Sequence, residues 1–344
     1  MQKAKFPHME WAKAHTAKPL PIELGFSGAP HPAGNSYREY GSGDPALEAK
    51  IARKYGVPKG HVYLVGGTSL ANFVTFAALV ERGAVVGVET PRYAPLAEIP
   101  KGLGANVQDI RRRADGTLGA IPKTASLVAV TSPHNPTGRL LHEADWKKLV
   151  RFADRGGVVI VDEVYRDLQT RPPAVAAARH ERFLTTGGLS KSYGLGALRV
   201  GWVLGAPALL QKIAHADNLI SVQCATPSID LLKKLWSRLP EFRRNAMRPV
   251  RSNLATLRRS GIPFIEPQAG LTAFVKVGDA DRCAAAMAKL GVGIAPGSFF
   301  GDSRYARVFL GADPRPFREG IAFLRDYLRG YLIGPKRSRD ADSS

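Results

Sequence analysis

The 344-residue chain predicts an α/β fold with two domains, a large one and a small one. The large domain would hold a mainly parallel central sheet flanked by helices, and the smaller α+β domain would be built from both termini. Two observations predict this fold. Continuous apolar runs rich in β-branched residues, typical of strands buried on both faces, alternate with amphipathic helical patterns. Polar motifs follow the ends of these runs, where α/β proteins bind their ligands.

Four apolar runs predict the strands of the large sheet, at residues 61–65, 84–88, 127–130 and 157–161. Two helical patterns lie between them. Residues 69–82 and 143–155 each carry their apolar side chains on one face and stop at a glycine. Strands and helices in this order predict right-handed crossover connections.

The second half of the chain predicts a smaller unit. It begins with a long helix over 240–260 that Pro249 would bend. Strands at 264–265 and 272–277 and helices at about 279–290 and 316–331 complete the unit. We therefore expect a large domain over 44–236, a small domain formed by 1–43 and 237–333, and a disordered, charged tail over 334–344.

Composition limits the function. The net charge is +20, but the basic residues are dispersed and no nucleic-acid-binding motif accompanies them, so we expect small anions rather than nucleic acid as partners. The chain has no apolar run of about 18 residues, the length that would predict a membrane span. The N-terminus lacks the apolar core of a secretory signal. Two distant cysteines and eight histidines without metal spacing predict a cytoplasmic protein that holds no metal.

Lys191 is the candidate reactive residue. It lies in a Gly/Ser turn, and Arg199 follows eight positions later. A lysine amine can form a Schiff base with an aldehyde cofactor, and an arginine can hold that cofactor's phosphate. Taken alone, a lysine in such a turn is more often a solvated surface residue. The interpretation therefore depends on the motifs at the strand ends.

Two of these motifs suit a flat, phosphorylated ligand. Gly66, Gly67 and Thr68 follow a predicted strand and open a helix, where free N–H groups and the helix dipole attract an anion. Tyr93 follows the next strand and could stack on a ring. The alternatives are a tight strand-to-helix turn and an aromatic side chain packed under a loop.

Two further motifs place polar groups at strand ends. Asn135 is held between prolines in the loop 132–138, which presents its amide in a fixed position. Asp162 ends a buried strand, where its carboxylate needs a partner such as a protonated ring nitrogen, and Tyr165 follows three residues later. The alternative for Asp162 is a helix cap.

In this order, the motifs resemble those of the class I/II aminotransferases, which are fold-type-I pyridoxal-phosphate (PLP) enzymes, from Gly28 to about Asp313. The resemblance implies pyridoxal 5'-phosphate as cofactor and a role in amino acid metabolism. Lys191 would form the Schiff base and Asp162 would pair with the ring nitrogen. The other implied cofactor contacts are Gly67, Thr68 and Arg199 at the phosphate, Tyr93 on the ring face, and Asn135 and Tyr165 at the ring hydroxyl.

The same resemblance implies a substrate site and a homodimer. Arg307 would clamp the substrate carboxylate, with Arg304 as the competing candidate, and Asn135 would also contact the substrate. Gly28 lies in a segment similar to the loop that closes over the substrate. Tyr40 resembles a tyrosine that the family lends to the phosphate of the neighbouring subunit.

The expected reaction moves an amino group between an amino acid and a 2-oxo acid. The cofactor ring, kept protonated by Asp162, acts as the electron sink, and Lys191 moves the proton as general base and acid. Lyase, decarboxylase or cyclase chemistry is the alternative, because substrate orientation decides which bond breaks. Gly188 departs from the family, which often has a phosphate-binding serine there. The phosphate cup then either lacks one donor or takes it from Thr186 or Ser190.

Overall fold

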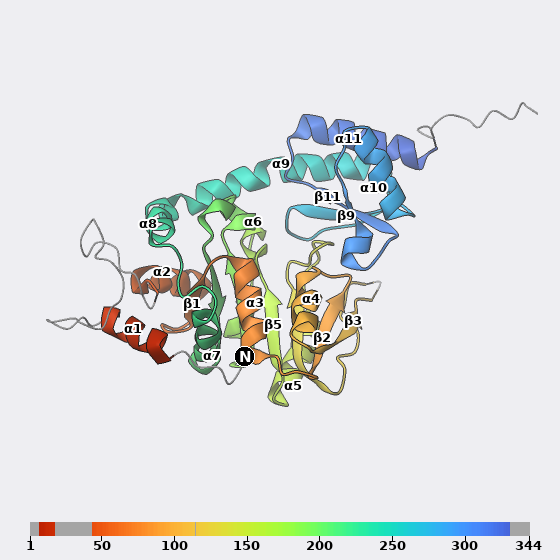
Figure 1. The fold of residues 1–344 in the computed structure, drawn as a ribbon. Helices are drawn as coiled ribbons and strands as arrows, with labels where there is room; N and C mark the ends of the chain where they lie inside the picture. The colour runs from red at the N-terminus through yellow and green to blue at the C-terminus, as the bar shows by residue number, and fades with distance from the viewer. Residues whose placement is uncertain (1–6, 18–42, 114, 331–344) are drawn as a thin grey trace, which may run out of the picture.

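The computed structural model describes residues 7–17, 43–113 and 115–330 (Figure 1). Its large sheet confirms the predicted α/β class. The seven strands run in the order β1-β7-β6-β5-β4-β2-β3. Only β7 pairs antiparallel, with β1 and β6 on its two sides. The strands are β1 (Val62–Val65), β2 (Val85–Thr90), β3 (Asn106–Arg111), β4 (Ala125–Thr131), β5 (Val158–Asp162), β6 (Phe183–Gly188) and β7 (Gly201–Leu204).

Helices cover both faces of this sheet because successive residues of each strand point to opposite sides. In β5, Ile160 packs in a core with α3 (Thr68–Leu79) and α7 (Pro207–Asn218). Val159 and Val161 pack on the other face with α5 (Glu143–Asp154). Both faces of the central strands are therefore buried, as their continuous apolar runs predict.

Four further helices belong to this unit. They are α2 (Pro45–Tyr55), α4 (Pro95–Gly102), α6 (Ser190–Tyr193) and α8 (Thr226–Leu235). Asp44 caps α2 by accepting a hydrogen bond from the N–H of Leu47 at 2.8 Å. Short 3₁₀ helices lie at η2 (Arg166–Leu168), η3 (Ala176–Ala178), η4 (Gly196–Leu198) and η5 (Trp236–Arg238).

The second unit has a four-stranded antiparallel sheet in the order β10-β11-β9-β8. The strands are β8 (Phe264–Ile265), β9 (Thr272–Lys276), β10 (Ala295–Pro296) and β11 (Tyr305–Phe309), with η6 (Gly297–Phe300) after β10. Three helices accompany them: α9 (Leu239–Arg259), α10 (Ala280–Lys289) and α11 (Pro314–Leu328). Tyr165 and Leu168, which follow β5, pack into this second core and so join the two units.

The N-terminal helix α1 (Pro7–Ala17) lies beside the large unit. Lys13 Nζ donates to Asn218 Oδ1 of α7 at 2.5 Å and to the carbonyl of Val222 at 2.6 Å. Within the segment 1–43, which we expect to belong to the small domain, residues 7–17 thus contact the large unit. A lysine that bonds to a residue 205 positions away leaves no local signal of its partner.

Gly28, Tyr40 and the tail 334–344 lie outside the described residues. Within the described ranges, no helix combines the length and apolar character that a membrane crossing requires.

Candidate active site

The predicted site residues meet at one edge of the large sheet. Parallel strands bring their carboxyl ends to the same edge, so the segments after β1, β2, β4, β5 and β6 converge there. Lys191 lies in α6, directly after β6. Arg199 precedes β7, which runs in the opposite direction and therefore starts at this same edge. Both side chains are exposed to solvent.

Asp162 is a buried carboxylate held by neutral donors. Its Oδ2 accepts from Asn72 Nδ2 at 2.9 Å, and its Oδ1 accepts from the N–H of Val164 at 3.0 Å. Burial raises the pKa of Asp162, whereas these hydrogen bonds and the nearby charge of Lys191 oppose that rise. A cation or a positively charged N–H at the open side of the carboxylate would satisfy it. The geometry therefore favours a ligand contact over a helix cap.

Asn72 is a residue that sequence reasoning missed. It is 1% exposed on α3, and its Oδ1 accepts a hydrogen bond from Thr186 Oγ1 at 2.7 Å. A chain of two hydrogen bonds thus runs from Thr186 through Asn72 to Asp162. The available signal was a lone amide on the apolar face of helix 68–79, one turn after Thr68.

Asn135 and Arg307 come together from the two units. Arg307 Nη1 donates to Asn135 Oδ1 at 3.0 Å, and its guanidinium lies 4.7 Å from the centre of the Phe300 ring. The competing Arg304 is exposed and paired with Asp302 at 2.7 Å. Arg307 is thus the arginine at the site, with Phe300 as a support that the sequence did not reveal.

Tyr93 and Tyr165 face the same space. Burial raises the pKa of both hydroxyls, and the charges of Asp162 and Arg307 act on both. A side-chain hydrogen bond with Ser69 opposes the rise at Tyr93. The two hydroxyls are thus within electrostatic reach of the same carboxylate and the same guanidinium.

Gly67, Thr68 and Arg199 form what we call the anion cup. The backbone of Gly67 has φ +92°, and a Cβ there would lie 2.6 Å from Arg199 Nη2, so only glycine fits. Arg199 donates to the carbonyl of Gly66 at 3.1 Å. The Thr68 hydroxyl is buried and has no hydrogen-bond partner among the residues that the structure describes. An unpaired donor at the N-terminus of α3 beside a guanidinium suits an anion such as phosphate.

Gly188 lies against this cup. A Cβ at Gly188 would sit 2.5 Å from Thr68 Oγ1. Thr186 cannot replace the missing family serine, because its hydroxyl is bonded to Asn72. Ser190 begins α6, and no hydrogen bond of its side chain is seen among the described residues. The hydroxyl at position 68 thus occupies the space that a side chain at 188 would need.

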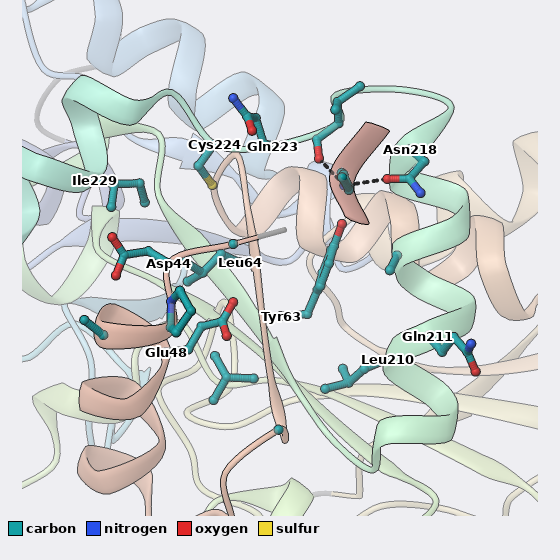
Figure 2. Close-up of a pocket in the computed structure, with 18 of the residues that line it drawn as sticks. Asp44, Glu48, Tyr63, Leu64, Leu210, Gln211, Asn218, Gln223, Cys224 and Ile229 are labelled. Carbon is teal, nitrogen blue, oxygen red and sulfur yellow. Dashed lines mark hydrogen bonds between the residues drawn. The ribbon is translucent and has the colours of Figure 1, made fainter. Parts of the chain in front are cut away.

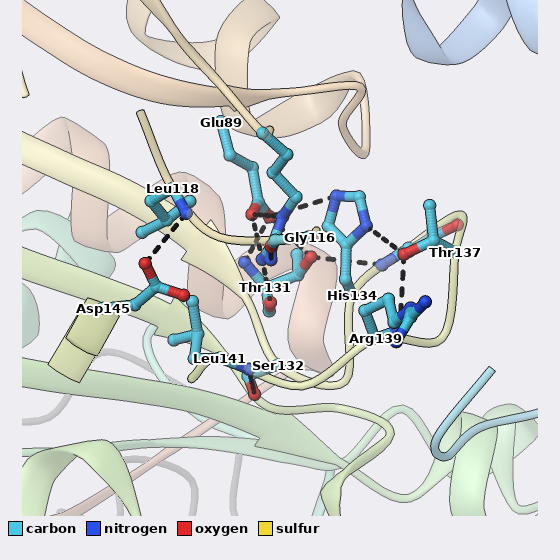
Figure 3. A network of polar contacts seen from close by, with 12 residues as sticks. Glu89, Gly116, Leu118, Thr131, Ser132, His134, Thr137, Arg139, Leu141 and Asp145 are labelled. Carbon is cyan, nitrogen blue, oxygen red and sulfur yellow. Dashed lines mark hydrogen bonds and ion pairs between the residues drawn. The ribbon is translucent and has the colours of Figure 1, made fainter. Parts of the chain in front are cut away.

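A buried polar network supports the loop that carries Asn135 (Figure 3). Glu89 at the end of β2 accepts hydrogen bonds from Arg112 at 2.6 Å and from the Thr131 hydroxyl at 2.6 Å. Thr131 Oγ1 in turn accepts from the N–H of Asn135 at 3.2 Å. The ring of His134 contacts the Thr137 hydroxyl at 2.7 Å and the Pro91 carbonyl at 2.8 Å.

This network keeps His134 neutral. Burial and the nearby charge of Arg112 hold the pKa of His134 well below its ordinary value. Burial raises the pKa of Glu89, while Arg112 and Thr131 oppose the rise. A satisfied network of this kind fixes one conformation. It ties the Tyr93 segment to the Asn135 loop through Pro91.

Helix α6 is anchored by the two residues that follow Lys191. Ser192 Oγ donates to the carbonyl of Val164 at 3.1 Å, which ties the helix to the segment after Asp162. The Tyr193 hydroxyl donates to Asp167 Oδ2 at 2.5 Å. Lys191 therefore projects from a fixed backbone, although its own side chain is exposed.

The arrangement fits a planar, phosphorylated aldehyde. The anion cup has an unpaired donor for a phosphate, Asp162 is a buried acceptor for a ring N–H, and Lys191 supplies the amine. Among the described residues, no three His, Cys, Asp or Glu side chains are grouped to hold a metal ion.

A cavity of about 1120 Å³ lies elsewhere, lined by residues of α1, α2, β1, α7 and α8 (Figure 2). It contains none of the predicted site residues among the side chains that line it. The strand ends remain the candidate active site, because Lys191, the buried Asp162 carboxylate and the anion cup lie there.

Comparisons with known proteins identify the family and the fold. The sequence profile described as aminotransferase class I and II matches residues 6–322. Capreomycidine synthase of Streptomyces vinaceus is 29% identical over 86% of this chain and 82% of its own length. Aspartate aminotransferase of Thermococcus kodakarensis is 28% identical over 82% of this chain and 78% of its own. In fold, the chain is similar to the crystal structure of aspartate aminotransferase from Thermotoga maritima (TM-score 0.77, 19% identity, 95% of this chain and 89% of that one).

Proposed function

Since the chain belongs to the class I and II aminotransferase family and is a PLP-dependent enzyme, we propose that Lys191 is its catalytic amine. The observation that carries this proposal is the buried Asp162 carboxylate. It is held by neutral donors and lies within electrostatic reach of Lys191. A carboxylate so placed supports pairing with a protonated ring beside the lysine amine.

The cofactor, when bound, supplies an aldehyde for amine exchange and a protonated ring that withdraws electrons from the reacting carbon. Gly67, Thr68 and Arg199 would hold its phosphate, and Asp162 its ring nitrogen. Tyr93 would cover the ring face. Asn135 and Tyr165 would hydrogen-bond the ring hydroxyl.

Lys191 would move the proton. Its side chain is exposed on the anchored helix α6. The amine would therefore be free to take a proton from the α-carbon of the substrate and to return it to a neighbouring carbon atom. Asp162 would keep the ring nitrogen protonated during the transfer. Because the backbone around α6 is fixed, the Lys191 amine would be held close to the atoms between which it moves the proton.

Arg307 would bind the carboxylate of the substrate. Its guanidinium is held by Asn135 Oδ1 and stacked on Phe300, so one edge of the fork is oriented toward the site. A two-point grip on a carboxylate fixes the orientation of the α-carbon bonds, which decides the bond that breaks.

The proposal includes a cytoplasmic homodimer. The unpaired Cys224 and Cys283 support a reducing compartment. The segment around Tyr40 supports a shared active site, in which Tyr40 of one subunit reaches the phosphate in the other. Gly28 would close over the substrate.

The test measures amino transfer from a panel of amino acids to 2-oxo acids by the purified, PLP-loaded protein. We expect Lys191→Ala to lower the rate by at least about 1,000-fold, because it removes the proton-transfer group and the attachment point. Lys212→Ala, an exposed lysine on α7, should leave the rate unchanged. Turnover by Lys191→Ala at a rate near wild type would overturn the role of Lys191.

A second reaction type is worth measuring because one relative is named capreomycidine synthase rather than aminotransferase. The same samples should be assayed for ammonia and carbon dioxide without any 2-oxo acid. Steady release under those conditions would favour a lyase, decarboxylase or cyclase on this fold. Strict dependence on the 2-oxo acid would favour amino transfer.

A further inference from the structure

A groove of about 690 Å³ runs along α9, the long helix that connects the two units (Figure 1). The groove is also lined by Gln169, Thr170 and residues 267–270, which we call its wall, and by apolar residues that we call its floor. The floor residues are Leu168, Met247, Val250, Leu254 and Leu310. The groove shares no lining residue with the strand-end site.

Five arginines line the groove, and no acidic residue does. They are Arg243, Arg244, Arg248, Arg251 and Arg258. The positions 244, 248, 251 and 258 recur at helical spacing, so α9 presents them on one face. Like charges at such spacing destabilise an isolated helix. The stripe therefore costs stability unless something anionic lies against it.

Most of this charge lacks a protein partner. Arg258 pairs with Glu266 at 2.5 Å. Arg244, Arg248 and Arg251 are exposed and form no ion pair with any residue that the structure describes. Arg243 donates through Nη2 to the carbonyl of Gln169 at 2.8 Å, while its buried Nε has no partner.

We propose that this groove binds a small ligand with two or more phosphate groups on an apolar or flat ring body, the chemistry of a nucleoside diphosphate. Guanidinium forks match phosphate oxygens in bidentate geometry. The volume lies within the roughly 300–1,000 Å³ that small-ligand sites occupy. The apolar floor takes the ring, and the arginine stripe takes the phosphates.

The groove adjoins the supports of the catalytic site. The N–H groups of Gln268 and Ala269, in its wall, donate to the carbonyl of Gly138 at 2.9 and 3.0 Å. Gly138 ends the loop that carries Asn135, and Leu168 follows Tyr165 by three residues. This second site is independent of the role proposed for Lys191, because binding there is measured without turnover.

The experiment is calorimetric titration of the PLP-loaded protein, in which the anion cup is already occupied. ADP, inorganic pyrophosphate and adenosine are the probes. We expect ADP to bind, pyrophosphate to bind more weakly because it lacks a ring, and adenosine to give no signal. A triple variant, Arg244→Gln/Arg248→Gln/Arg251→Gln, should weaken ADP binding at least 10-fold.

The matched control removes the same charge elsewhere. Arg53→Gln/Arg151→Gln/Arg318→Gln changes three exposed arginines on α2, α5 and α11, and should alter ADP affinity less than twofold. Equal loss in both triple variants would overturn the groove as the site, because diffuse charge would then explain binding. Absence of ADP binding would also overturn it.

Two further measurements complete the test. The single variant Arg251→Glu, checked for an unchanged thermal midpoint, should lower ADP affinity if the triple variant folds poorly. A 20-nucleotide single strand and vesicles containing anionic phospholipid are titrated in parallel. Groove-dependent binding of either one without ADP binding would contradict a small-ligand site and assign the stripe to a macromolecule or a membrane surface.

Discussion

The Thr68 hydroxyl occupies the space in the anion cup that a side chain at position 188 would need. The hydroxyl of Thr68 is buried without a partner, and a Cβ at position 188 would lie 2.5 Å from it. Where the family often has a serine, this chain has a glycine, and the neighbouring threonine fills the space. We interpret this difference as an exchange, in which the Thr68 hydroxyl replaces the serine hydroxyl that the family often has at position 188.

The first prediction concerns cofactor affinity. Thr68→Val should weaken PLP binding by about 10-fold or more, since a hydrogen bond to a charged group contributes about 1.5–3 kcal/mol. Thr68→Ser should retain most of the affinity. Gly188→Ser should weaken binding, because its Cβ displaces the Thr68 hydroxyl. Absorbance titration of the apoenzyme measures all three, and tighter binding by Gly188→Ser would refute the exchange.

The second prediction concerns Asn72, a positioning residue for Asp162. Burial raises the pKa of Asp162, and the Asn72 amide opposes the rise. In Asn72→Leu the pKa should rise further, so Asp162 becomes protonated, and activity is lost, at a higher pH. The acid limb of kcat/KM should therefore move upward. Thr75→Val, a buried position on α3 whose hydroxyl has no partner, is the control and should keep the wild-type profile.

At the level of single elements, the four strands of the large sheet that we predicted are those with continuous apolar runs. The run at 157–161 became β5, Val158–Asp162, because its continuous apolar pattern is a local property. β3 was missed because it is an edge strand with exposed polar residues. β6 was missed because Thr185 and Thr186 are buried, with hydroxyls bonded to Glu163 and Asn72. Glu163 and Asn72 are distant in sequence from these threonines. A local pattern therefore predicts that Thr185 and Thr186 are exposed to solvent.

The N-terminus of α2 provides the third prediction. Burial and the charge of Asp44 raise the pKa of Glu48 to about 7 from an ordinary value of 4.5. Lys233 pairs with Asp44 at 2.8 Å, and Glu48 lies beside that pair (Figure 2). The folded state therefore holds a proton that the unfolded state releases. The stabilisation is complete below pH 4.5 and is lost as the pH rises through 7.

Unfolding in urea at pH 5 and pH 8 measures this effect. Wild type should lose up to about 3 kcal/mol between the two, at about 1.4 kcal/mol for each pKa unit. Glu48→Gln should lose much less. Glu143→Gln, at an exposed position in the first turn of α5, should behave as wild type. An unchanged pH dependence in Glu48→Gln would show that another group controls it.

At the scale of the whole molecule, the site exists only where the two units meet. Asn135 of the large unit and Arg307 of the second unit are 172 residues apart and bond at 3.0 Å. The motifs identified both residues, because each carries its own local pattern. The roles of Asn72, Phe300 and the Glu89 network depend on partners that only the fold brings near, and a lone amide on an apolar helix face was the one local signal, for Asn72. The contact between α1 and α7 has no local signal for the same reason.

One measurement tests the central claim, that Lys191 carries the cofactor at this edge of the sheet. The PLP-loaded protein is reduced with borohydride, digested with trypsin and analysed by mass spectrometry. We expect the cofactor to be fixed to the peptide Phe183–Arg199, in which cleavage after Lys191 is blocked. Attachment to any other lysine, or loss of all cofactor on unfolding after reduction, would contradict it.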